Sequence, residues 1–409
     1  MTAEATQAHH VNLRPLLPLY LVIFIAFCGY ALMVTLFIPM LMGDYGFVPQ
    51  DAPVARRTAI VGVLLAIYPL GQFFGAPAIG VFSDRYGRKP VLLISLVCSV
   101  GAFAVIALGI EWRNLYLLGI GCLVGGLAES NIAIVQSAIS DVTHPDERAR
   151  LFAWIYSASS VGYIAGPVAG GQLAIWAGWS APFWVTVALL ALTGLWVTTA
   201  FIETHPPETG RDLDYKAAVT NLFTVFTDRP IRRLYLVNFL LYLALFGYFR
   251  MILVYMAEFW HMQVARSTMV YSYLALVSLT ASFALMAPLT KRFGLRRVAI
   301  ASALAGGVAM IVIVIPPGEN TVWFTAGAAT LIGTLTISAC GAILANAVSA
   351  DRQGRVMGNN QALQVGAEAL SAVLGGALAG LHVALPLTAS GLLLIASGLL
   401  LAASGGGRK

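Results

Sequence analysis

Three ionisable side chains lie deep inside long apolar segments of this 409-residue chain: Glu129, Arg250 and Glu368. A charge at the centre of a bilayer costs about 2.5 to 3.5 kcal/mol on insertion scales, so its retention predicts a use. A buried carboxyl group can bind and release a proton in each working cycle. A guanidinium keeps its charge, and its planar fork suits a carboxylate or a phosphate. We therefore expect Glu129 to be the proton-coupling acid, Glu368 to be the second candidate, and Arg250 to bind an anionic group of a substrate.

Two alternatives need no transport chemistry. Two of the three charges can form a structural ion pair, or the Arg250 side chain can extend outward to water. Around the charges, aromatic and polar residues on the same or neighbouring segments extend the candidate substrate site beyond Arg250 and Glu129. These residues are Tyr30, Asn131, Tyr156, Asn238, Tyr242 and Gln364.

The composition identifies the solvent around these segments. Hydrophobic residues make up 59% of the chain and charged residues only 10%, whereas a soluble domain carries about 25% charge. The apolar runs have the length of membrane helices, of about 20 residues, rather than of barrel strands, of about 10. The sequence therefore predicts an all-α membrane protein, because a helix satisfies its own backbone hydrogen bonds in hydrocarbon.

Twelve spans are expected. They lie near residues 16–42, 58–82, 90–110, 115–139, 151–175, 181–202, 234–257, 268–290, 298–315, 321–348, 356–381 and 385–403. The segment between the sixth and seventh spans is charged and contains two prolines, which is typical of a linker. We therefore predict five parts: a tail (1–15), a six-helix bundle (16–202), a cytoplasmic linker (203–233), a second six-helix bundle (234–403) and a short tail (404–409).

The basic residues predict the orientation. If both termini are cytoplasmic, 19 of the 24 Lys and Arg residues fall on the cytoplasmic side, four fall outside, and Arg250 lies within a span. This bias follows the positive-inside rule. We therefore expect a multi-pass protein of a bacterial inner membrane. Because the basic residues sit in short loops rather than on one face, they do not indicate binding to nucleic acid.

The two halves of the chain resemble each other. The loop at Asp84–Lys89 after the second span matches the loop at residues 291–296 after the eighth span, an offset of 207 residues. Residues 146–150 before the fifth span match residues 351–355 before the eleventh, an offset of 205 residues. Both offsets are close to half the chain length, so we expect two pseudo-symmetric halves with parallel topology.

Two motifs identify a family. Residues 80–89, GVFSDRYGRK, fit the G-x-x-x-D-R-x-G-R-R/K signature of the major facilitator superfamily, and this chain resembles that superfamily. Glycines permit a tight turn, and the acid and bases can form charge pairs that break in another conformation, as a gate requires. The gating residues that the resemblance implies are Gly80, Asp84, Arg85, Gly87, Arg88 and Lys89.

The second motif lies in the fifth span. Residues 162–171, GYIAGPVAGG, match the G-x-x-x-G-P-x-x-G-G antiporter motif of the same superfamily, which the family associates with proton-coupled export. Small residues let helices approach closely, and a proline removes a backbone hydrogen bond. The residues carried over are Gly162, Gly166, Pro167, Gly170 and Gly171.

Within that superfamily the chain resembles the twelve-helix drug/proton antiporter group, of the tetracycline-efflux type, and residues 140–150 resemble the corresponding loop of that group. Two positions depart from the group's pattern. Cys122 stands where such exporters place an arginine in the fourth span, and the first span carries no acid. The usual proton relay and drug specificity of the group are therefore not carried over. The resemblance implies that the first, fourth, seventh and tenth spans line the cavity, and it would then put Glu129 and Arg250 at the substrate path.

The first functional hypothesis is a proton-coupled exporter, an antiporter that moves a small amphipathic or anionic organic molecule by alternating access. The second is proton-coupled uptake of an organic anion or of a metal chelate of the siderophore type. The third, of another class, is a membrane sensor or scaffold that transports nothing. The chain has no Walker loop, no G-x-S-x-G and no H-E-x-x-H, and its four cysteines lack metal-ligand spacing. We therefore expect no enzyme, no cofactor and no metal, a proton gradient as the energy source, and a monomer whose partners are its substrate, protons and lipid.

Overall fold

The computed structural model describes residues 14–43, 45–49, 51–129, 131–143, 145–206, 225, 231–315 and 318–404. Within these ranges the regular structure is all helical. The first half contains α1 (Leu17–Met42), α2 (Val54–Tyr86), α3 (Arg88–Glu111), α4 (Leu115–Ala128), α5 (Asn131–Val142), α6 (Pro145–Ala177) and α7 (Ala181–Ala200). The second half contains α9 (Arg232–Phe259), α10 (Val264–Thr280), a π-helical turn (Ala281–Leu285), α11 (Met286–Phe293), α12 (Leu295–Val312), α13 (Val322–Asn346), α14 (Ala350–Leu381) and α15 (Leu385–Ala403).

The helices agree with the twelve predicted spans. Eleven segments of the described chain are long and apolar enough to cross a membrane, and the remaining span, the fifth, corresponds to the 33-residue α6. The all-α membrane fold is confirmed. Most of the predicted tails and linker lies outside the described residues, so the boundaries of those parts stay predictions.

The fourth span differs from the prediction of one continuous helix. It is divided into α4 and α5: α4 ends at Ala128, the backbone of Glu129 is no longer helical, and α5 begins at Asn131. Gly125 and Gly126 lie in the last turn of α4, and the polar run 129–131 follows them. Glycine weakens a helix, while serine and asparagine side chains compete for backbone hydrogen bonds. A hydropathy pattern averages over such a run and therefore misses the break.

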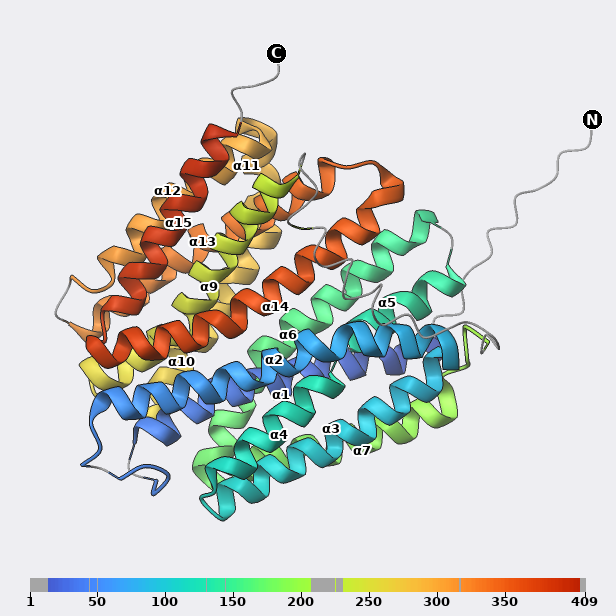
Figure 1. The fold of residues 1–409 in the computed structure, drawn as a ribbon, viewed down its shortest axis with the longest axis horizontal. Helices are drawn as coiled ribbons and strands as arrows, with labels where there is room; N and C mark the ends of the chain where they lie inside the picture. The colour runs from blue at the N-terminus through green and yellow to red at the C-terminus, as the bar shows by residue number, and fades with distance from the viewer. Residues whose placement is uncertain are drawn as a thin grey trace, which may run out of the picture.

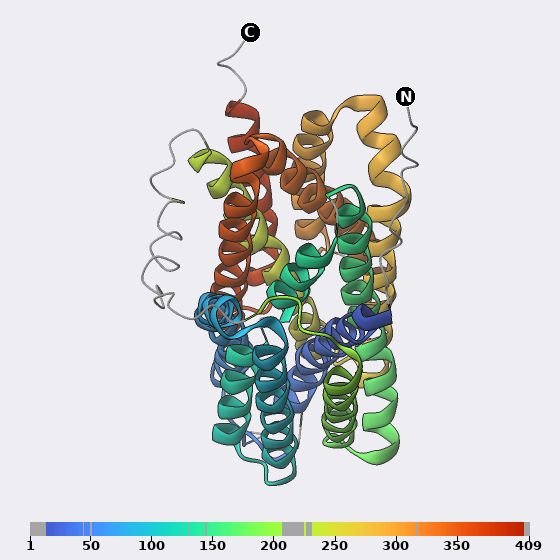
Figure 2. The same ribbon diagram turned by 90° about the vertical axis from the view of Figure 1, so that its right-hand side faces the viewer.

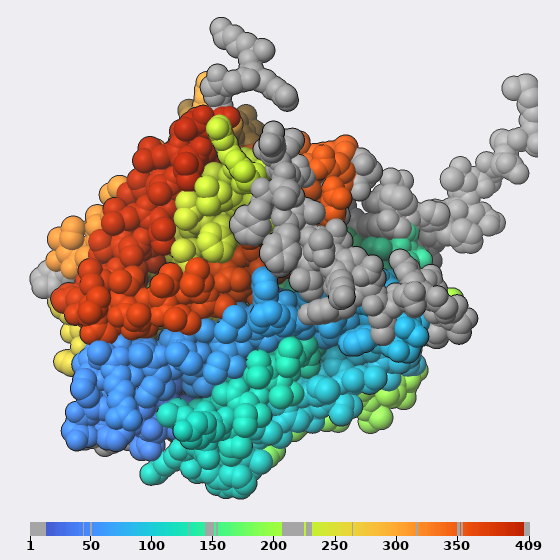
Figure 3. All heavy atoms as spheres, in the orientation of Figure 1, coloured from blue at the N-terminus to red at the C-terminus, as the bar shows by residue number. Residues whose placement is uncertain are grey.

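The helices form two bundles that meet along a seam (Figures 1 and 2). Helix α2 lies alongside α14 and α6 lies against α10, so each contact joins one bundle to the other. In the space-filling view, the blue surface of α2 and the orange surface of α14 run side by side (Figure 3). In α1 and α9 the apolar window is buried to a larger share than in the nine other candidate spans, so these two helices lie at the centre of the molecule.

The bundles approach most closely at the end where α2 begins and α14 ends. A Cβ atom at Gly62 would lie 2.6 Å from the Ala372 carbonyl oxygen, and one at Gly376 would lie 2.5 Å from the Thr58 carbonyl oxygen. At the other end of the same two helices, Gly80 has no neighbouring atom within 4 Å of such a Cβ. Helices α2 and α14 also diverge toward that end in Figure 1. In the predicted topology, the bundles are therefore closed at the outer end and apart at the cytoplasmic end.

Candidate functional site

Arg250 and Glu368 form a buried ion pair between α9 and α14. Arg250 is only 2% exposed and Glu368 only 6%. The Arg250 Nη2 lies 2.8 Å from Glu368 Oε1, and its Nη1 donates to the Glu368 backbone carbonyl. Two of the three buried charges thus form an ion pair, as the first alternative proposed. The second alternative, in which the Arg250 side chain extends outward to water, is wrong. An ion pair removed from water is balanced finely between attraction and desolvation, so a change on either partner has a large effect.

Tyr30 of α1 completes the cluster from the opposite bundle. Its hydroxyl oxygen accepts a hydrogen bond from Arg250 Nη2 at 2.5 Å, and its hydroxyl group donates to Glu368 Oε1. The Tyr30 ring lies 5.3 Å from the Tyr68 ring and 6.1 Å from the Tyr163 ring, between centroids. Three residues that the sequence predicted separately, 220 and 118 positions apart, are therefore brought into one hydrogen-bonded group.

Glu129 lies at the break between α4 and α5. Its backbone nitrogen donates to the Gly125 carbonyl at 2.9 Å and so ends α4. Its Oε2 is buried, and among the described residues no group forms a hydrogen bond with it. Glu129 as a whole is half-buried, so only this one oxygen is shown to lack both water and a partner. A buried acceptor without a donor is costly, and a bound proton or a donor from a ligand removes that cost. The carboxyl group lies near enough to the Tyr163 phenol to interact with it electrostatically.

Asn131 follows the same break but is engaged within its own bundle. Its side-chain oxygen accepts a hydrogen bond from the Ser95 hydroxyl of α3 at 2.6 Å, and this hydroxyl also lies 2.7 Å from the Ala128 carbonyl. Asn131 is 2% exposed. In this conformation Asn131 therefore anchors the helix break to α3, and its contact with a substrate stays a prediction.

A second group of polar side chains joins α9 to α14, nearer than the ion pair to the first residues of both helices. The Asn238 amide donates to the Asn360 side-chain oxygen at 3.0 Å, and the Asn360 amide donates to the Tyr242 hydroxyl at 2.7 Å. Asn360 was not predicted as a site residue, although it stands in the polar run upstream of Glu368. Gln364, half-buried, lies one helical turn before Glu368 on α14.

Tyr156 of α6 is 59% exposed and receives a hydrogen bond of 3.4 Å from Gln136 of α5. Tyr242 of the opposite bundle is 4% exposed and is bonded to Asn360. The structure therefore gives the two tyrosines separate hydrogen-bond partners, and their predicted contact with a substrate stays a prediction.

The gating motif forms a charge network inside the first bundle. Arg88 is 7% exposed; its Nη1 lies 2.6 Å from Asp84 Oδ1 and its Nε lies 3.2 Å from Asp141 Oδ2. The Lys89 ammonium donates to the Thr198 carbonyl at 2.8 Å, and the Arg85 guanidinium lies 5.4 Å from the centre of the Tyr86 ring. The network thus ties the loop between α2 and α3 to the ends of α5 and α7.

Glu203 belongs to this network and was missed. Its carboxylate accepts hydrogen bonds from the backbone nitrogens of Arg88 at 2.9 Å and Lys89 at 3.0 Å, the first two residues of α3. An acid at a helix N-terminus is favourable because it pairs with free N–H groups. Gly87 has a φ of +96°, and a Cβ there would lie 2.6 Å from Glu203 Oε2. The sequence signal was an acid directly after the sixth span, but nothing in the sequence placed it beside Gly87.

The antiporter motif packs α6 against α1. A Cβ at Gly162 would lie 2.6 Å from the Phe24 carbonyl oxygen, and one at Gly166 would lie 2.5 Å from the Cys28 carbonyl oxygen. Gly170 continues the same face of α6 and contacts Leu32 in the next turn of α1, with Pro167 inside the helix.

Gly171, the last glycine of the motif, faces the other bundle. A Cβ there would lie 2.7 Å from Thr268 Cγ2 of α10. The motif therefore supplies close helix contacts both within the first bundle and across the seam.

The family model of the Major Facilitator Superfamily matches residues 19–287. The chain belongs to the major facilitator superfamily. The tetracycline resistance protein of class C from Escherichia coli is 39% identical over 147 residues, which cover 36% of each chain, and that of class B is 34% identical over 173 residues, which cover 42% of each. The chain thus spans less than half the length of these relatives. Multidrug resistance protein 2 of Bacillus subtilis is 25% identical over 344 residues, which cover 82% of this chain and 83% of the relative.

Solved structures of other transporters share the fold. The human organic anion transporter MFSD10 (TETRAN) superposes with a TM-score of 0.71 at 20% identity, covering 95% of this chain and 99% of the other. A POT family transporter superposes with a TM-score of 0.73 at 14% identity, covering 95% and 96%. These likenesses show the fold alone. Membership of the major facilitator superfamily, which the family model shows, makes the chain a multi-pass membrane transporter rather than an enzyme.

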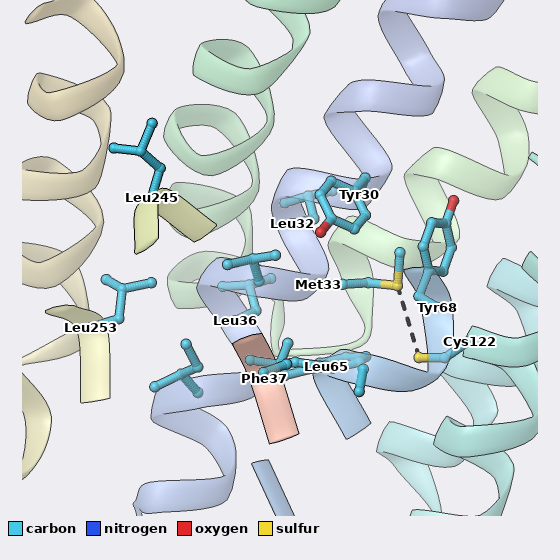
Figure 4. Close-up of a cluster of buried hydrophobic side chains, with 14 of the residues drawn as sticks. Tyr30, Leu32, Met33, Leu36, Phe37, Leu65, Tyr68, Cys122, Leu245 and Leu253 are labelled. Atoms are coloured by element: carbon cyan, nitrogen blue, oxygen red, sulfur yellow. Dashed lines mark hydrogen bonds between the residues drawn. The ribbon is translucent and has the colours of Figure 1, made fainter. Parts of the chain in front are cut away.

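One departure from the antiporter group is visible at the centre of this major facilitator protein. Cys122 is 1% exposed and its sulfur lies 3.9 Å from the Met33 sulfur, in the apolar cluster that surrounds Tyr30 (Figure 4). The position is packed by α1 and offers no charge to a substrate. The charged groups of the site come instead from α9, α14 and the α4–α5 break.

Proposed function

We propose that this transporter is a proton-coupled exporter that exchanges a proton for a small amphipathic organic molecule by alternating access. The relatives named as tetracycline and multidrug resistance proteins support export of a drug-like compound. The observation that carries proton coupling is the buried Oε2 of Glu129, which has no described hydrogen-bond partner. We place the protein in a bacterial inner membrane as a monomer with both termini in the cytoplasm.

Glu129 has the properties that exchange requires. In an antiporter the proton and the substrate must compete, so that binding one releases the other. The unpartnered Oε2 can be satisfied either by a proton or by a donor from a substrate. A substrate that presents a hydrogen-bond donor or a positive charge to Glu129 therefore displaces the proton.

Proton coupling through Arg250 and Glu368 would give symport, in which the proton and the substrate move in the same direction, rather than antiport. An anion that binds Arg250 must displace the Glu368 carboxylate, which lies 2.8 Å away. Protonation of Glu368 removes the competing charge and frees the guanidinium. The proton and the anion then bind together, as in symport.

Coupling through Arg250 and Glu368 supports the second candidate function, which is uptake of an organic anion or chelate, and it does so only if the substrate is anionic. For export, we infer that the substrate is neutral or cationic where it meets Glu129. The non-transporting sensor is the least consistent of the hypotheses with membership of a transporter superfamily, and a flux measurement tests it directly.

Flux in proteoliposomes separates these candidates. Purified protein is reconstituted with trapped pyranine, a pH gradient is imposed, and tetracycline, ethidium or salicylate is added as a neutral-to-zwitterionic, cationic or anionic probe. Export predicts that movement of one of the first two probes is accompanied by proton movement in the opposite direction. Proton movement in the same direction as salicylate would support uptake, and no proton-linked flux of any probe would contradict both.

Two glutamine variants provide the comparison. Glu129→Gln removes the exchangeable proton and should abolish gradient-driven flux. Glu111→Gln is the matched control, because Glu111 lies at the end of α3, accepts a hydrogen bond of 2.8 Å from the Trp184 indole, and keeps an acceptor as glutamine. Gradient-driven flux at the wild-type rate in Glu129→Gln would remove Glu129 from the coupling role.

A further inference from the structure

We infer that the Tyr30 hydroxyl is a clasp between the two bundles, which holds this conformation and which a proton on Glu368 releases. The inference builds on the proposed transport cycle, since alternating access requires contacts that form in one state and break in the other. It assigns Tyr30 a different role from the substrate contact that its position in the sequence suggested.

The contacts of Tyr30 cross the seam. Tyr30 belongs to α1 of the first bundle, whereas Arg250 and Glu368 belong to α9 and α14 of the second. Both hydrogen bonds of the phenol, one accepted from Arg250 and one donated to Glu368, therefore connect the bundles. The ion pair itself lies within the second bundle and needs no movement of its backbone when the bundles rotate.

The three side chains are enclosed. Tyr30 is 8% exposed, and its ring is covered by Tyr68 of α2 and Tyr163 of α6. Tyr271 of α10 lies near enough to Arg250 and Glu368 to interact with both electrostatically. In these surroundings water cannot readily replace the phenol, so a broken clasp leaves buried donors and acceptors that must find other partners.

The charge on Glu368 determines the strength of the clasp. An ionised Oε1 accepts from both the Tyr30 hydroxyl and the Arg250 guanidinium. Hydrogen bonds to an ionised acceptor are about twice as strong as neutral ones. A proton on Glu368 removes the ionised acceptor, weakens both contacts and favours separation of α1 from the second bundle.

Tyr68 offers a matched comparison within the same aromatic group. Its ring is 2% exposed and lies 5.3 Å from the Tyr30 ring, but its hydroxyl has no hydrogen-bond partner among the described residues. Tyr30→Phe and Tyr68→Phe both remove one buried hydroxyl from α1 or α2 and keep the ring. Only Tyr30→Phe removes hydrogen bonds across the seam.

Pulsed electron paramagnetic resonance measures the separation of the bundles. Nitroxide labels are attached at Tyr116→Cys on α4 and Phe324→Cys on α13, whose native side chains are 84% and 82% exposed. Both positions lie at the start of their helices, on the predicted outer side. The labels are carried by the full chain, with its four native cysteines replaced, in lipid nanodiscs at pH 8 and pH 5.

The clasp predicts a change in the outer-side distance. At pH 8, Tyr30→Phe and Glu368→Gln should each raise the ratio of the longer to the shorter distance about tenfold, which corresponds to ~1.4 kcal/mol. Tyr68→Phe should match the wild type. The wild type at pH 5 should move toward Glu368→Gln, and this shift should be lost in Glu368→Gln itself.

Two results would overturn the clasp. The first is a distance distribution for Tyr30→Phe that coincides with that of Tyr68→Phe. The second needs no substitution at Tyr30: wild-type distances that are the same at pH 8 and pH 5. Neither depends on a substrate or on the direction of transport, so the clasp can fail while proton-coupled flux is observed, and it can hold while Glu129→Gln transports normally.

Discussion

The buried ion pair predicts an asymmetry between its two partners. Glu368→Ala leaves the Arg250 guanidinium charged, 2% exposed and without its carboxylate. Removing one partner of a buried pair costs about 3 to 5 kcal/mol when the other must remain charged. Arg250 cannot give up its proton, so this full cost is expected for Glu368→Ala.

Arg250→Ala should be milder. The Glu368 carboxyl group that it leaves behind can take up a proton and lose its charge, and it still has the Tyr30 hydroxyl beside it. The remaining loss is that of hydrogen bonds to a charged donor, about 1.5 to 3 kcal/mol. The two variants should therefore differ in free energy of unfolding by ~2 kcal/mol, or about 30-fold in the equilibrium constant.

The pH dependence gives a second measure of the same asymmetry. In Arg250→Ala the folded protein holds a proton on Glu368 that the unfolded chain releases at neutral pH. The folded state then binds more protons, so stability should rise as the pH falls, by up to about 1.4 kcal/mol per pH unit. Glu368→Ala has no such proton and should not show this rise.

The assay is unfolding by sodium dodecyl sulfate in mixed micelles, followed by the fluorescence of the eight tryptophans between pH 5 and pH 8. The double variant should be closer to Arg250→Ala than to Glu368→Ala, because no unpaired cation remains. If Arg250→Ala is as unstable as Glu368→Ala at every pH, the guanidinium is not held by the carboxylate and this reasoning is refuted.

Further predictions concern the two motifs. Gly166→Val should push α6 away from the α1 backbone, at a cost of about 1 to 3 kcal/mol and with loss of transport, whereas Gly80→Ala should be neutral in thermal denaturation because it has 4 Å of open space. Glu203→Ala should lower thermal stability by about 0.5 to 2 kcal/mol because the N-terminus of α3 loses its acceptor; an unchanged midpoint would contradict this role. Gly87→Ala and Gly294→Ala both introduce a side chain at positive φ, at +96° and +85°. Gly87→Ala should be the more destabilising in the same assay, because only there would the new Cβ meet the Glu203 carboxylate; equal effects would mean that backbone strain alone matters.

The helices and their grouping were predictable because hydrocarbon imposes a simple rule. Every spanning segment must be apolar for about 20 residues and must satisfy its own backbone, so hydropathy alone predicts the twelve spans. The loops at residues 84–89 and 291–296 revealed the repeat because gates at the same place in both halves need similar turns. The helix break at Glu129 escaped because it depends on a few polar and glycine residues within an apolar window.

The partners of the site residues were not predictable. The sequence marks Arg250 and Glu368 as buried charges, but whether they meet each other depends on the rotation of α9 and α14 about their axes. Tyr30 is one of several tyrosines in the spans, and only the approach of α1 to the second bundle gives its hydroxyl two charged neighbours. Glu203 likewise meets Gly87 through the folding of α7 beside α3 rather than through any local pattern.

Proton release on substrate binding tests the central proposal most directly. Purified protein in weakly buffered detergent solution at neutral pH is mixed with a transported probe, tetracycline or ethidium, and the pH is followed with a soluble indicator. Exchange at Glu129 predicts that the wild type and Glu111→Gln release protons as the probe saturates the protein, and that Glu129→Gln binds the probe without release. Proton uptake on binding, or release that persists in Glu129→Gln, would contradict it.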